Sequence, residues 1–407
     1  MAIIVQKYGG SSVADAEKIK NVARRVAARC DRGEELVVVV SAMGKTTDQL
    51  IDLARQVSDQ PEDREMDVLL STGETVSSSL MAMALRAMGY PAISLSGAQA
   101  GIGTEARYGR ARILSVEPQR MHKELKEGKI VIVAGFQGVS EELDITTLGR
   151  GGSDTTAVSL AVALKAATCE IYTDVDGVYT TDPRIEPKAR KLKEINYEEM
   201  LELATYGAKV MHNRAVELGK VYNMPILVAS SFRDVPGTLI HGGTDMVEQR
   251  NKVSGIACDR DVAKVTVRGV PDRPGIAASL FGSLSDAGIS VDTIVQNASV
   301  EKVTDLTFTV SRKDLDKTMK LMSPLAQQIK AGEILSDRSL AKVSVVGAGM
   351  QSGPGYAATM FRTLFNAGIN IELITTSEIR ITCIISESQV EDAVRALHKA
   401  FELEQAQ

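Results

Sequence analysis

Two glycine-rich turns carry residue types that can bind and transfer a phosphoryl group. The first turn spans Lys7–Ser12, and the second spans Gly149–Asp154. Each turn follows an apolar run typical of a strand and precedes a helical pattern. Backbone N–H groups and a helix N-terminus can therefore converge on an anion at each turn. The first turn also carries a lysine, and the second carries an arginine and an aspartate. This combination favours phosphoryl transfer over simple phosphate binding.

The first turn offers one cation and several backbone donors to a triphosphate. Lys7 would lie against the β- and γ-phosphates, while Gly9, Gly10 and Ser11 would offer N–H groups. The Walker-type phosphate-loop pattern is absent, so the turn belongs to another class of phosphate site. A tight turn with a solvated lysine is the alternative interpretation of the same residues.

The second turn combines a carboxylate with a planar cation. Asp154 could orient Lys7 or a Mg²⁺–nucleotide complex, and Arg150 could clamp a carboxylate through two parallel hydrogen bonds. Ser153 or Asp154 could also simply cap the following helix, and such a cap is compatible with both roles.

Three further segments offer groups for a nucleotide or an amino acid. In the loop after a predicted strand, Asp174 suits a ribose, Tyr179 a base and Arg184 a phosphate. Lys209 is a second candidate phosphate cation, although a solvated lysine is equally consistent with its sequence context. Glu74 is either an acid in the first turn of a helix or a partner for a substrate ammonium group.

Composition restricts the class of protein. The chain has 407 residues, 44% of them apolar, with a net charge of −5 and a pI near 5.6. This charge disfavours non-specific binding to nucleic acid or to an anionic membrane. The four cysteines and four histidines show no metal-ligand spacing, so we expect no dedicated transition-metal site. The opening apolar run, Ala2–Val5, is too short for a signal peptide, and we expect a cytoplasmic protein.

The first 245 or so residues alternate short β-branched runs with helical patterns. This alternation predicts a mostly parallel sheet covered by helices, with ligands beyond the carboxyl ends of its strands. The predicted strands are Leu36–Val40, Ala92–Leu95, Ile130–Ala134, Cys169–Thr173 and Pro225–Ala229, and the predicted helices include Ala14–Cys30, Met66–Met88 and Ser153–Ala166.

The remainder of the chain contains an internal repeat. Residues 264–337 and 342–407 each show a strand, a Pro-Gly turn, a helix, two strands and a helix. The first copy closes with a strand near Glu333–Leu335, but the second ends before a last strand. We predict that Val253–Cys258 pairs with the second copy, which would make the first copy an insertion within the second.

Several motifs in order resemble those of the aspartokinase family, and the resemblance covers essentially the whole chain. It implies an amino-acid-kinase α/β domain over residues 1–245, a three-layer fold with a mostly parallel sheet. Two ferredoxin-like βαββαβ ACT domains would follow, over 264–337 and 342–407, the latter completed by strand 253–258. The motifs are Lys7–Ser12, Ser41–Met43, Ser71–Glu74, Thr147–Asp154, Tyr172–Gly177 and Thr376–Ile379.

The resemblance implies ATP- and Mg²⁺-dependent phosphorylation of the β-carboxylate of L-aspartate to 4-phospho-L-aspartate. This reaction opens lysine, threonine and methionine synthesis. The implied catalytic residues are Lys7, Asp154 and Arg150. Aspartate would be held by Thr47, Glu74, Arg150 and Ser153. The ATP site would be lined by Lys7, Gly9, Gly10, Ser11, Ser41, Thr173, Asp174, Tyr179, Arg184 and Lys209.

The repeats resemble sensors for amino acids. In the family such units pair across subunits, and lysine and threonine bind at the shared interface. We therefore expect a homo-oligomer formed through the ACT domains, or an α2β2 assembly if a separate regulatory chain is made. A purely structural dimerisation module is the alternative. The implied effector contacts are Asp272, Ile276, Ala277, Gln296, Asn297, Asn370, Ile371 and Ser377.

Three other classes are weighed against this interpretation. Glutamate, acetylglutamate and uridylate kinases share the kinase fold, but the double repeat and the Ser71–Glu74 turn argue against them. A non-catalytic amino-acid-binding regulator should have lost at least one of Lys7, Arg150, Asp154 and Asp174. A dinucleotide-dependent dehydrogenase is disfavoured because its glycine pattern is absent after the first strand of this sequence. One departure from the family is Asn213, where many relatives have a proline that would stiffen the turn.

Overall fold

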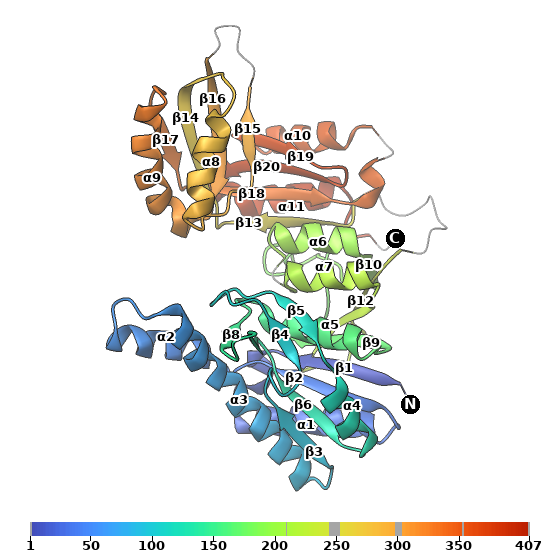
Figure 1. Cartoon of the computed structure of the whole chain (residues 1–407). Helices are drawn as coiled ribbons and strands as arrows, with labels where there is room; N and C mark the ends of the chain where they lie inside the picture. The colour runs from blue at the N-terminus through green and yellow to red at the C-terminus, as the bar shows by residue number, and fades with distance from the viewer. Residues whose placement is uncertain (1, 209, 244–252, 298–302, 352–353, 406–407) are drawn as a thin grey trace. The chain divides into compact units, whose positions relative to one another are not determined.

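An eight-stranded, mostly parallel sheet organises the N-terminal part of the chain (Figure 1). The computed structural model describes residues 2–208, 210–243, 253–297, 303–351 and 354–405. These residues divide into two units. The first comprises the described residues up to Tyr179, Lys191–Thr205 and residues 210–243, and the second comprises Thr180–Arg190, Tyr206–Ala208 and the described residues from 253 onward.

The large sheet of the first unit has the strand order β10-β12-β11-β9-β1-β2-β6-β3. Its neighbouring strands run parallel except for the antiparallel pair β11 and β12. The strands are β1 (Ile3–Tyr8), β2 (Glu35–Val40), β3 (Ala92–Leu95), β6 (Ile130–Ala134), β9 (Thr168–Thr173), β10 (Glu194–Asn196), β11 (Ile226–Ser230) and β12 (Thr238–His241).

Helices cover both faces of this sheet, as the unbroken apolar runs of β2 and β6 require. The helices of the unit are α1 (Ala16–Cys30), α2 (Thr46–Val57), α3 (Asp63–Ala87), α4 (Gln119–Lys126), α5 (Gly152–Ala163), α6 (Tyr197–Thr205) and α7 (Asn213–Tyr222), with a short 3₁₀ helix at Gly10–Val13. A smaller sheet has the order β5 (Ile113–Val116), β4 (Ile102–Thr104), β7 (Gln137–Val139) and β8 (Ile145–Thr147).

Helix α1 illustrates how the sequence fixes these elements. Asp15 caps its N-terminus by accepting a hydrogen bond from the backbone N–H of Lys18. Its buried residues, Ile19, Val22, Ala23, Val26 and Ala27, follow helical spacing and pack on the sheet. Tyr8 of β1 belongs to the same core, so the odd-numbered side chains of β1 point to the other face.

Helix α3 is the one helix among the described residues that is long and apolar enough to cross a membrane. Half of its apolar window is buried inside the protein, and Met81 and Leu85 are fully buried in the core of the first unit. Its burial is that of a core helix.

The second unit contains two four-stranded antiparallel sheets, one for each repeat (Figure 1). The first has the order β15 (Ile294–Gln296), β16 (Val303–Val310), β14 (Ala263–Pro271) and β17 (Ile334–Asp337), with helices α8 (Ile276–Asp286) and α9 (Leu315–Gln328). The second has the order β13 (Gly255–Asp259), β18 (Leu340–Val346), β20 (Arg380–Ser386) and β19 (Leu373–Thr376), with helices α10 (Tyr356–Asn366) and α11 (Val390–Ala400). Short 3₁₀ helices lie at Arg312–Asp314, Ala348–Gln351 and Glu387–Gln389.

Strand β13 precedes the first repeat in sequence but pairs antiparallel with β18 of the second repeat. The four strands of the second sheet therefore come from both sides of the first repeat.

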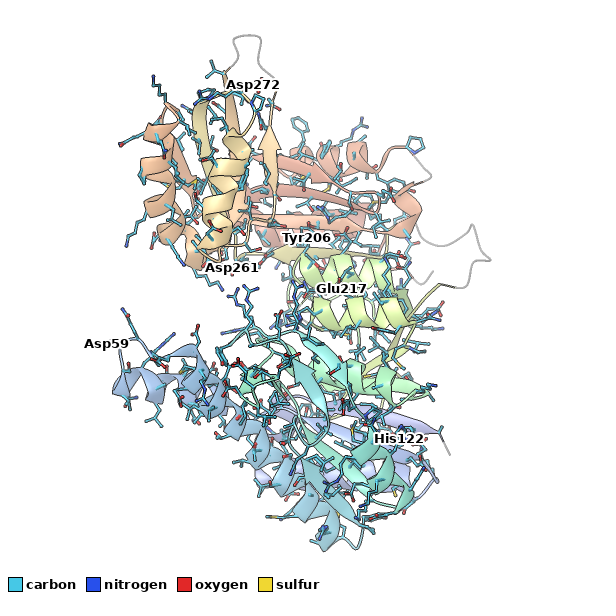
Figure 2. The ribbon with its side chains drawn as sticks, viewed as in Figure 1. Asp59, His122, Tyr206, Glu217, Asp261 and Asp272 are labelled. Atoms are coloured by element: carbon cyan, nitrogen blue, oxygen red, sulfur yellow. The ribbon has the colours of Figure 1, made fainter. Side chains whose placement is uncertain are left out.

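The sequence predicts one uninterrupted kinase domain over residues 1–245. The first unit differs from this prediction, because Thr180–Arg190 and Tyr206–Ala208 belong to the second unit. For example, the Arg380 guanidinium lies 4.0 Å from the centre of the Tyr206 ring, a residue labelled in Figure 2.

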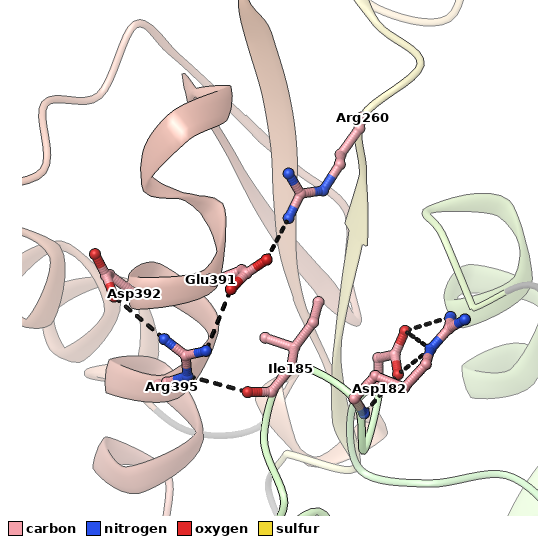
Figure 3. Close-up of polar contacts among 7 residues, drawn as sticks. Asp182, Ile185, Arg260, Glu391, Asp392 and Arg395 are labelled. Carbon is pink, nitrogen blue, oxygen red and sulfur yellow. Dashed lines mark hydrogen bonds and ion pairs between the residues drawn. The ribbon is translucent and has the colours of Figure 1, made fainter.

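Helix α11 of the second repeat holds the Thr180–Arg190 segment (Figure 3). The Nε atom of Arg395 donates to Ile185 O at 3.0 Å, and Glu391 and Asp392 fix the same guanidinium through ion pairs at 3.2 and 3.4 Å. The Ile185 side chain packs against the core of the second repeat.

Candidate active site

A nearly buried ion pair joins the two glycine turns. The Nζ atom of Lys7 lies 2.6 Å from Oδ1 of Asp154, and their side chains are only 12% and 10% exposed. Lys7 is near the end of β1 on the face opposite Tyr8, and Asp154 lies in the first turn of α5. The carboxylate therefore fixes the position of the ammonium group at the edge of the sheet, where a triphosphate would need it.

Two glycines allow the backbone to approach closely at this edge. A Cβ atom on Gly10 would lie 2.8 Å from the carbonyl oxygen of Ala42, and Gly10 O accepts a hydrogen bond from Gly44 N at 3.0 Å. Gly151 has a φ of 71°, and a Cβ atom there would lie 2.3 Å from the His212 ring. Larger residues at either position would push apart the chain segments that shape the site.

Glu74 places a buried carboxylate beside the turn that follows β2. Its Oε1 atom accepts a hydrogen bond from Ala42 N at 3.1 Å, and the residue is 3% exposed. Its Oε2 atom is buried and has no hydrogen-bond partner among the described residues. Burial raises the pKa of Glu74 from 4.5 to about 7. An unpaired buried carboxylate oxygen of this kind is suited to an ammonium group.

The other residues predicted to contact aspartate lie at three places. The Ser153 hydroxyl lies against Gly135 at the end of β6, where a Cβ atom would be 2.8 Å from its Oγ. Thr47 is half-buried near the start of α2. Arg150 is exposed between the two left-handed glycines of the second turn, and no partner of its side chain is found in the described part of the chain.

The predicted nucleotide residues are only partly brought together. Gly9 N donates to Tyr172 O at 3.3 Å, which places the first turn beside Thr173 and the exposed Asp174 at the end of β9. The backbone N–H of Ser41 donates to Tyr8 O at 3.1 Å, so Ser41 adjoins the same edge. Ser11 is exposed in the 3₁₀ helix after the turn, and Tyr179 is half-buried. Arg184 belongs to the second unit, and Lys209 lies outside the described residues.

A cavity of about 360 Å³ in the first repeat gathers four of the predicted effector residues. It lies where β14 turns into α8, and the left-handed Gly275, with a φ of 94°, precedes the helix. Asp272, labelled in Figure 2, lies in this turn. The four residues are Asp272, Ile276, Ala277 and Gln296, and Asn297 follows the last of them at the end of β15.

The effector residues predicted in the second repeat do not line this cavity. The amide of Asn370 donates to Glu372 at 3.1 Å, and Glu372 pairs with Lys264 at 2.9 Å. Ile371 packs against the core of the second repeat, and Ser377 N donates to Arg380 O at 2.8 Å.

Three residues that support the second turn were not predicted from the sequence as site residues. His212 N donates to Asp154 Oδ2 at 3.3 Å, and burial lowers the pKa of the His212 imidazole. The Arg214 guanidinium donates to the carbonyl oxygen of Leu148 at 2.8 Å. The buried Asp67 accepts from both the backbone N–H and the hydroxyl of Thr147. Each of these contacts joins residues far apart in sequence, and no local pattern announces them.

The catalytic unit and the repeats match two known domain types. Residues 2–230 match the amino acid kinase family, and residues 265–323 and 343–401 each match an ACT domain. An aspartate kinase of Pseudomonas putida is 51% identical over 404 residues, which cover 99% of this chain and 98% of that protein. An aspartokinase of Mycolicibacterium smegmatis is also 51% identical, over 99% of this chain and 97% of that protein. The chain belongs to the aspartokinase family.

Solved aspartokinase structures have the same architecture. Escherichia coli aspartokinase III in complex with aspartate and ADP aligns with a TM-score of 0.84 at 27% identity, covering 98% of this chain and 99% of that one. The lysine and aspartate complex of the same enzyme aligns with a TM-score of 0.75. The predicted fold class, an amino-acid-kinase domain followed by ACT domains, is confirmed. The chain is an aspartate kinase, as the sequence motifs indicated.

Proposed function

We propose that this aspartokinase transfers the γ-phosphoryl group of Mg-ATP to the β-carboxylate of L-aspartate. The products would be ADP and 4-phospho-L-aspartate, the starting point of lysine, threonine and methionine synthesis. The observation that carries the proposal is the nearly buried Lys7–Asp154 pair between two glycine turns. The complex of the E. coli relative with aspartate and ADP supports it.

In this proposal the first turn and the end of β9 bind the nucleotide. Lys7 covers the charge of the β- and γ-phosphates, and Asp154 keeps its ammonium group in place. The backbone N–H groups of the first turn add uncharged donors. The proposed ATP-binding residues remain Lys7, Gly9, Gly10, Ser11, Ser41, Thr173, Asp174, Tyr179, Arg184 and Lys209.

Aspartate would lie between the second turn and α3. Arg150 is exposed and suited to the α-carboxylate, whereas the unpaired oxygen of Glu74 is suited to the α-ammonium group. Thr47 and Ser153 would supply hydroxyl donors. An approaching ammonium group favours the ionised form of Glu74, because an opposite charge lowers the pKa of a buried carboxyl.

Mg²⁺ would arrive with the nucleotide. The described residues hold no group of three or more His, Cys, Asp or Glu side chains that could bind a metal ion. When bound to the triphosphate, Mg²⁺ neutralises part of its charge. Asp154, in the first turn of α5, and Asp174, directly after β9, are the carboxylates suited to its coordination sphere.

The reaction needs little acid–base chemistry. The attacking β-carboxylate is already an anion at neutral pH, so no strong general base is required. Two anions must instead be held together, and the enzyme supplies cations and proximity. Lys7 and Arg150 provide these cations from the two turns.

We further propose that lysine, threonine or both regulate the enzyme through the ACT repeats, residues 264–337 and 342–407 with strand 253–258. The cavity at Asp272 and Gly275 is lined by backbone N–H groups at a helix start and by a carboxylate, a combination suited to a free amino acid. A lysine complex of the E. coli relative supports this proposal. The contacts from Asn370, Ile371 and Ser377 would come from a paired subunit, in a homo-oligomer or an α2β2 assembly. We also infer that the protein is located in the cytoplasm.

A coupled assay of ADP release tests these proposals. The purified full chain is given Mg-ATP with L-aspartate or with L-glutamate, and the aspartate reaction is repeated with lysine, threonine and both. We expect turnover with aspartate but not glutamate, reduced by at least one effector condition. If aspartate is phosphorylated but neither lysine nor threonine changes the rate, the proposed kinase activity stands and the repeats would serve only in subunit assembly. Binding of aspartate without turnover would instead make the protein a regulator.

A further inference from the structure

Arg150 is carried on a turn that has little conformational restraint of its own. It stands between Gly149 and Gly151, whose φ angles of 78° and 71° lie in the left-handed region. Its side chain is exposed, and the described residues offer its guanidinium no partner. The position of this cation therefore depends on what anchors the residues on either side of it.

A buried carboxylate on helix α3 anchors the segment that leads into this turn. Asp67 is 1% exposed; its Oδ2 accepts a hydrogen bond from Thr147 N at 2.7 Å, and its Oδ1 accepts one from the Thr147 hydroxyl at 2.6 Å. Thr147 is the last residue of β8, three positions before Arg150. The partners of Asp67 are all donors, as an ionised carboxylate requires, and bonds to an ionised acceptor are stronger than those between neutral groups.

The same carboxylate holds the loop against which the turn packs. Gly109 N donates to both oxygen atoms of Asp67, at 3.0 and 2.9 Å. A Cβ atom on Gly149 would lie 3.1 Å from the carbonyl oxygen of Gly109, so the two backbones are in close contact. Ala111 N donates to Thr147 O at 2.9 Å. Asp67 therefore fixes both sides of this contact, the turn and the loop.

Helix α3 carries a second buried carboxylate of the proposed aspartate site. Asp67 and Glu74 are seven residues apart, two turns of the helix, and so share one of its faces. At a rise of about 1.5 Å per residue they are separated by about 10 Å along the helix axis. Glu74 is the proposed partner of the α-ammonium group, and Asp67 holds the turn that carries the proposed partner of the α-carboxylate. One helix thus sets the spacing of the two groups that would recognise the α-carbon substituents.

We propose that Asp67 is a positioning residue for aspartate, which holds the second turn so that Arg150 meets the α-carboxylate. The inference rests on the proposed contact between Arg150 and the α-carboxylate, and Asp67 itself would touch neither substrate. Anchoring the turn in the free enzyme spares the substrate the conformational entropy of ordering two glycines, so Asp67 raises the affinity for aspartate. Asp154 is held separately, by the Lys7 ammonium group and by His212 N, so nucleotide binding should not depend on Asp67.

The test is Asp67→Asn in the full chain, which keeps the shape of the side chain but cannot accept hydrogen bonds on both of its terminal atoms. We expect the KM for aspartate to rise roughly 10-fold, as for the loss of one hydrogen bond to a charged group. The kcat at saturating aspartate and the KM for ATP should stay within about twofold of the parent values. Asp63→Asn is the matched control, because Asp63 is exposed one turn earlier in α3, and it should leave all three constants unchanged. An unchanged KM for aspartate in Asp67→Asn would overturn the inference.

Variants of Thr147 make the test independent of how well Asp67→Asn folds. Thr147→Val removes the hydroxyl donor and leaves the backbone N–H bond in place. It should raise the KM for aspartate several-fold without changing the KM for ATP. Thr147→Ser keeps the donor and should give a KM for aspartate near that of the parent. Equal KM values for aspartate in the valine and serine variants would mean that the bond to Asp67 does not act on aspartate.

A double variant separates this inference from the proposed role of Arg150. The readout is the dissociation constant of L-aspartate, measured by equilibrium binding so that variants of low activity can be compared. If Asp67 acts through Arg150, then Arg150→Met should weaken binding, and adding Asp67→Asn should weaken it no further. Fully multiplicative effects would overturn the inference and leave Arg150 as an aspartate contact. Unchanged binding in Arg150→Met would overturn the inference with the role of Arg150, while turnover of aspartate by the parent would still support the kinase.

Discussion

Replacing Glu74 with glutamine should affect stability and substrate binding in opposite directions. The substitution keeps the shape of the side chain and removes a charge that is buried, with one oxygen unpaired among the described residues. The rise in the pKa from 4.5 to about 7 corresponds to a cost of about 3 kcal/mol for the ionised form in the free enzyme. Because the folded state holds this proton more tightly than the unfolded state, stability is lost as the pH rises from about 4.5 to about 7.

Glu74→Gln should therefore raise the free energy of unfolding at pH 8, by up to about 3 kcal/mol, and change it little at pH 5. The same variant should bind aspartate more weakly, because the carboxylate that would pair with the α-ammonium group is gone. Loss of a charged hydrogen bond is worth about 1.5–3 kcal/mol, so the KM for aspartate should rise roughly 10- to 150-fold. The KM for ATP should not change.

The assay is urea unfolding at pH 5 and pH 8, alongside steady-state kinetics at pH 8. Glu124→Gln is the matched control, because Glu124 is also a buried glutamate but pairs with Lys129 at 2.6 Å and with Arg120 at 2.7 Å. These partners lower the pKa of Glu124, so its replacement should destabilise the protein at pH 8 and leave the KM for aspartate unchanged. A Glu74→Gln protein that is less stable than the parent at pH 8, or that binds aspartate normally, would refute the reasoning.

Three further predictions concern the glycine turns and two histidines, His212 and His398. Lys7→Met should lower kcat at least 100-fold, the scale of a lost contact that stabilises transition-state charge, and a near-normal kcat would remove Lys7 from the mechanism. Gly151→Ala should destabilise the protein by about 1–3 kcal/mol in urea unfolding, because the methyl group meets the His212 ring at a positive φ; an unchanged midpoint would contradict the close approach. Burial lowers the pKa values of His212 and His398 below 6.5, so the unfolded state takes up protons first and stability should fall as the pH drops below about 6.5. The check is the urea midpoint of unfolding at pH 5.5 and at pH 7.5, measured in the Glu74→Gln variant so that the opposing effect of Glu74 is absent. A midpoint at pH 5.5 that is equal to or higher than that at pH 7.5 would contradict the predicted loss of stability.

The sequence was most informative where local order determines the contact. The expectation that Asp154 orients Lys7 used only the two glycine turns, each placed between a strand and a helix. Lys7 lies near the end of β1 and Asp154 in the first turn of α5, but the strand before the second turn is β8 of the smaller sheet and not a strand of the parallel sheet. The pairing of β13 with β18 could be predicted by counting the strands of each repeat. The second repeat has one strand fewer than the first, and one strand-like segment without a partner precedes the first repeat. Both inferences needed only the order of elements along the chain.

Contacts set by tertiary packing were not predictable in this way. The strands β4, β7 and β8 have three residues each, too few for a period to emerge, so the smaller sheet was missed. Asp67 bonds Thr147, 80 residues later in the chain, and nothing in its own helix indicates that partner. The sequence placed Arg184 with the kinase residues, but the packing of Ile185 in the core of the second repeat places its loop in the second unit.

The central claim is that the β-carboxylate of aspartate receives the phosphoryl group. An acyl phosphate reacts with hydroxylamine, so the most direct measurement is to run the reaction with Mg-ATP, L-aspartate and hydroxylamine and to measure hydroxamate and ADP together. The account predicts equal amounts of aspartyl hydroxamate and ADP, with neither formed from glutamate. ADP released without hydroxamate would mean that water or another group accepts the phosphoryl group, and the account would be wrong.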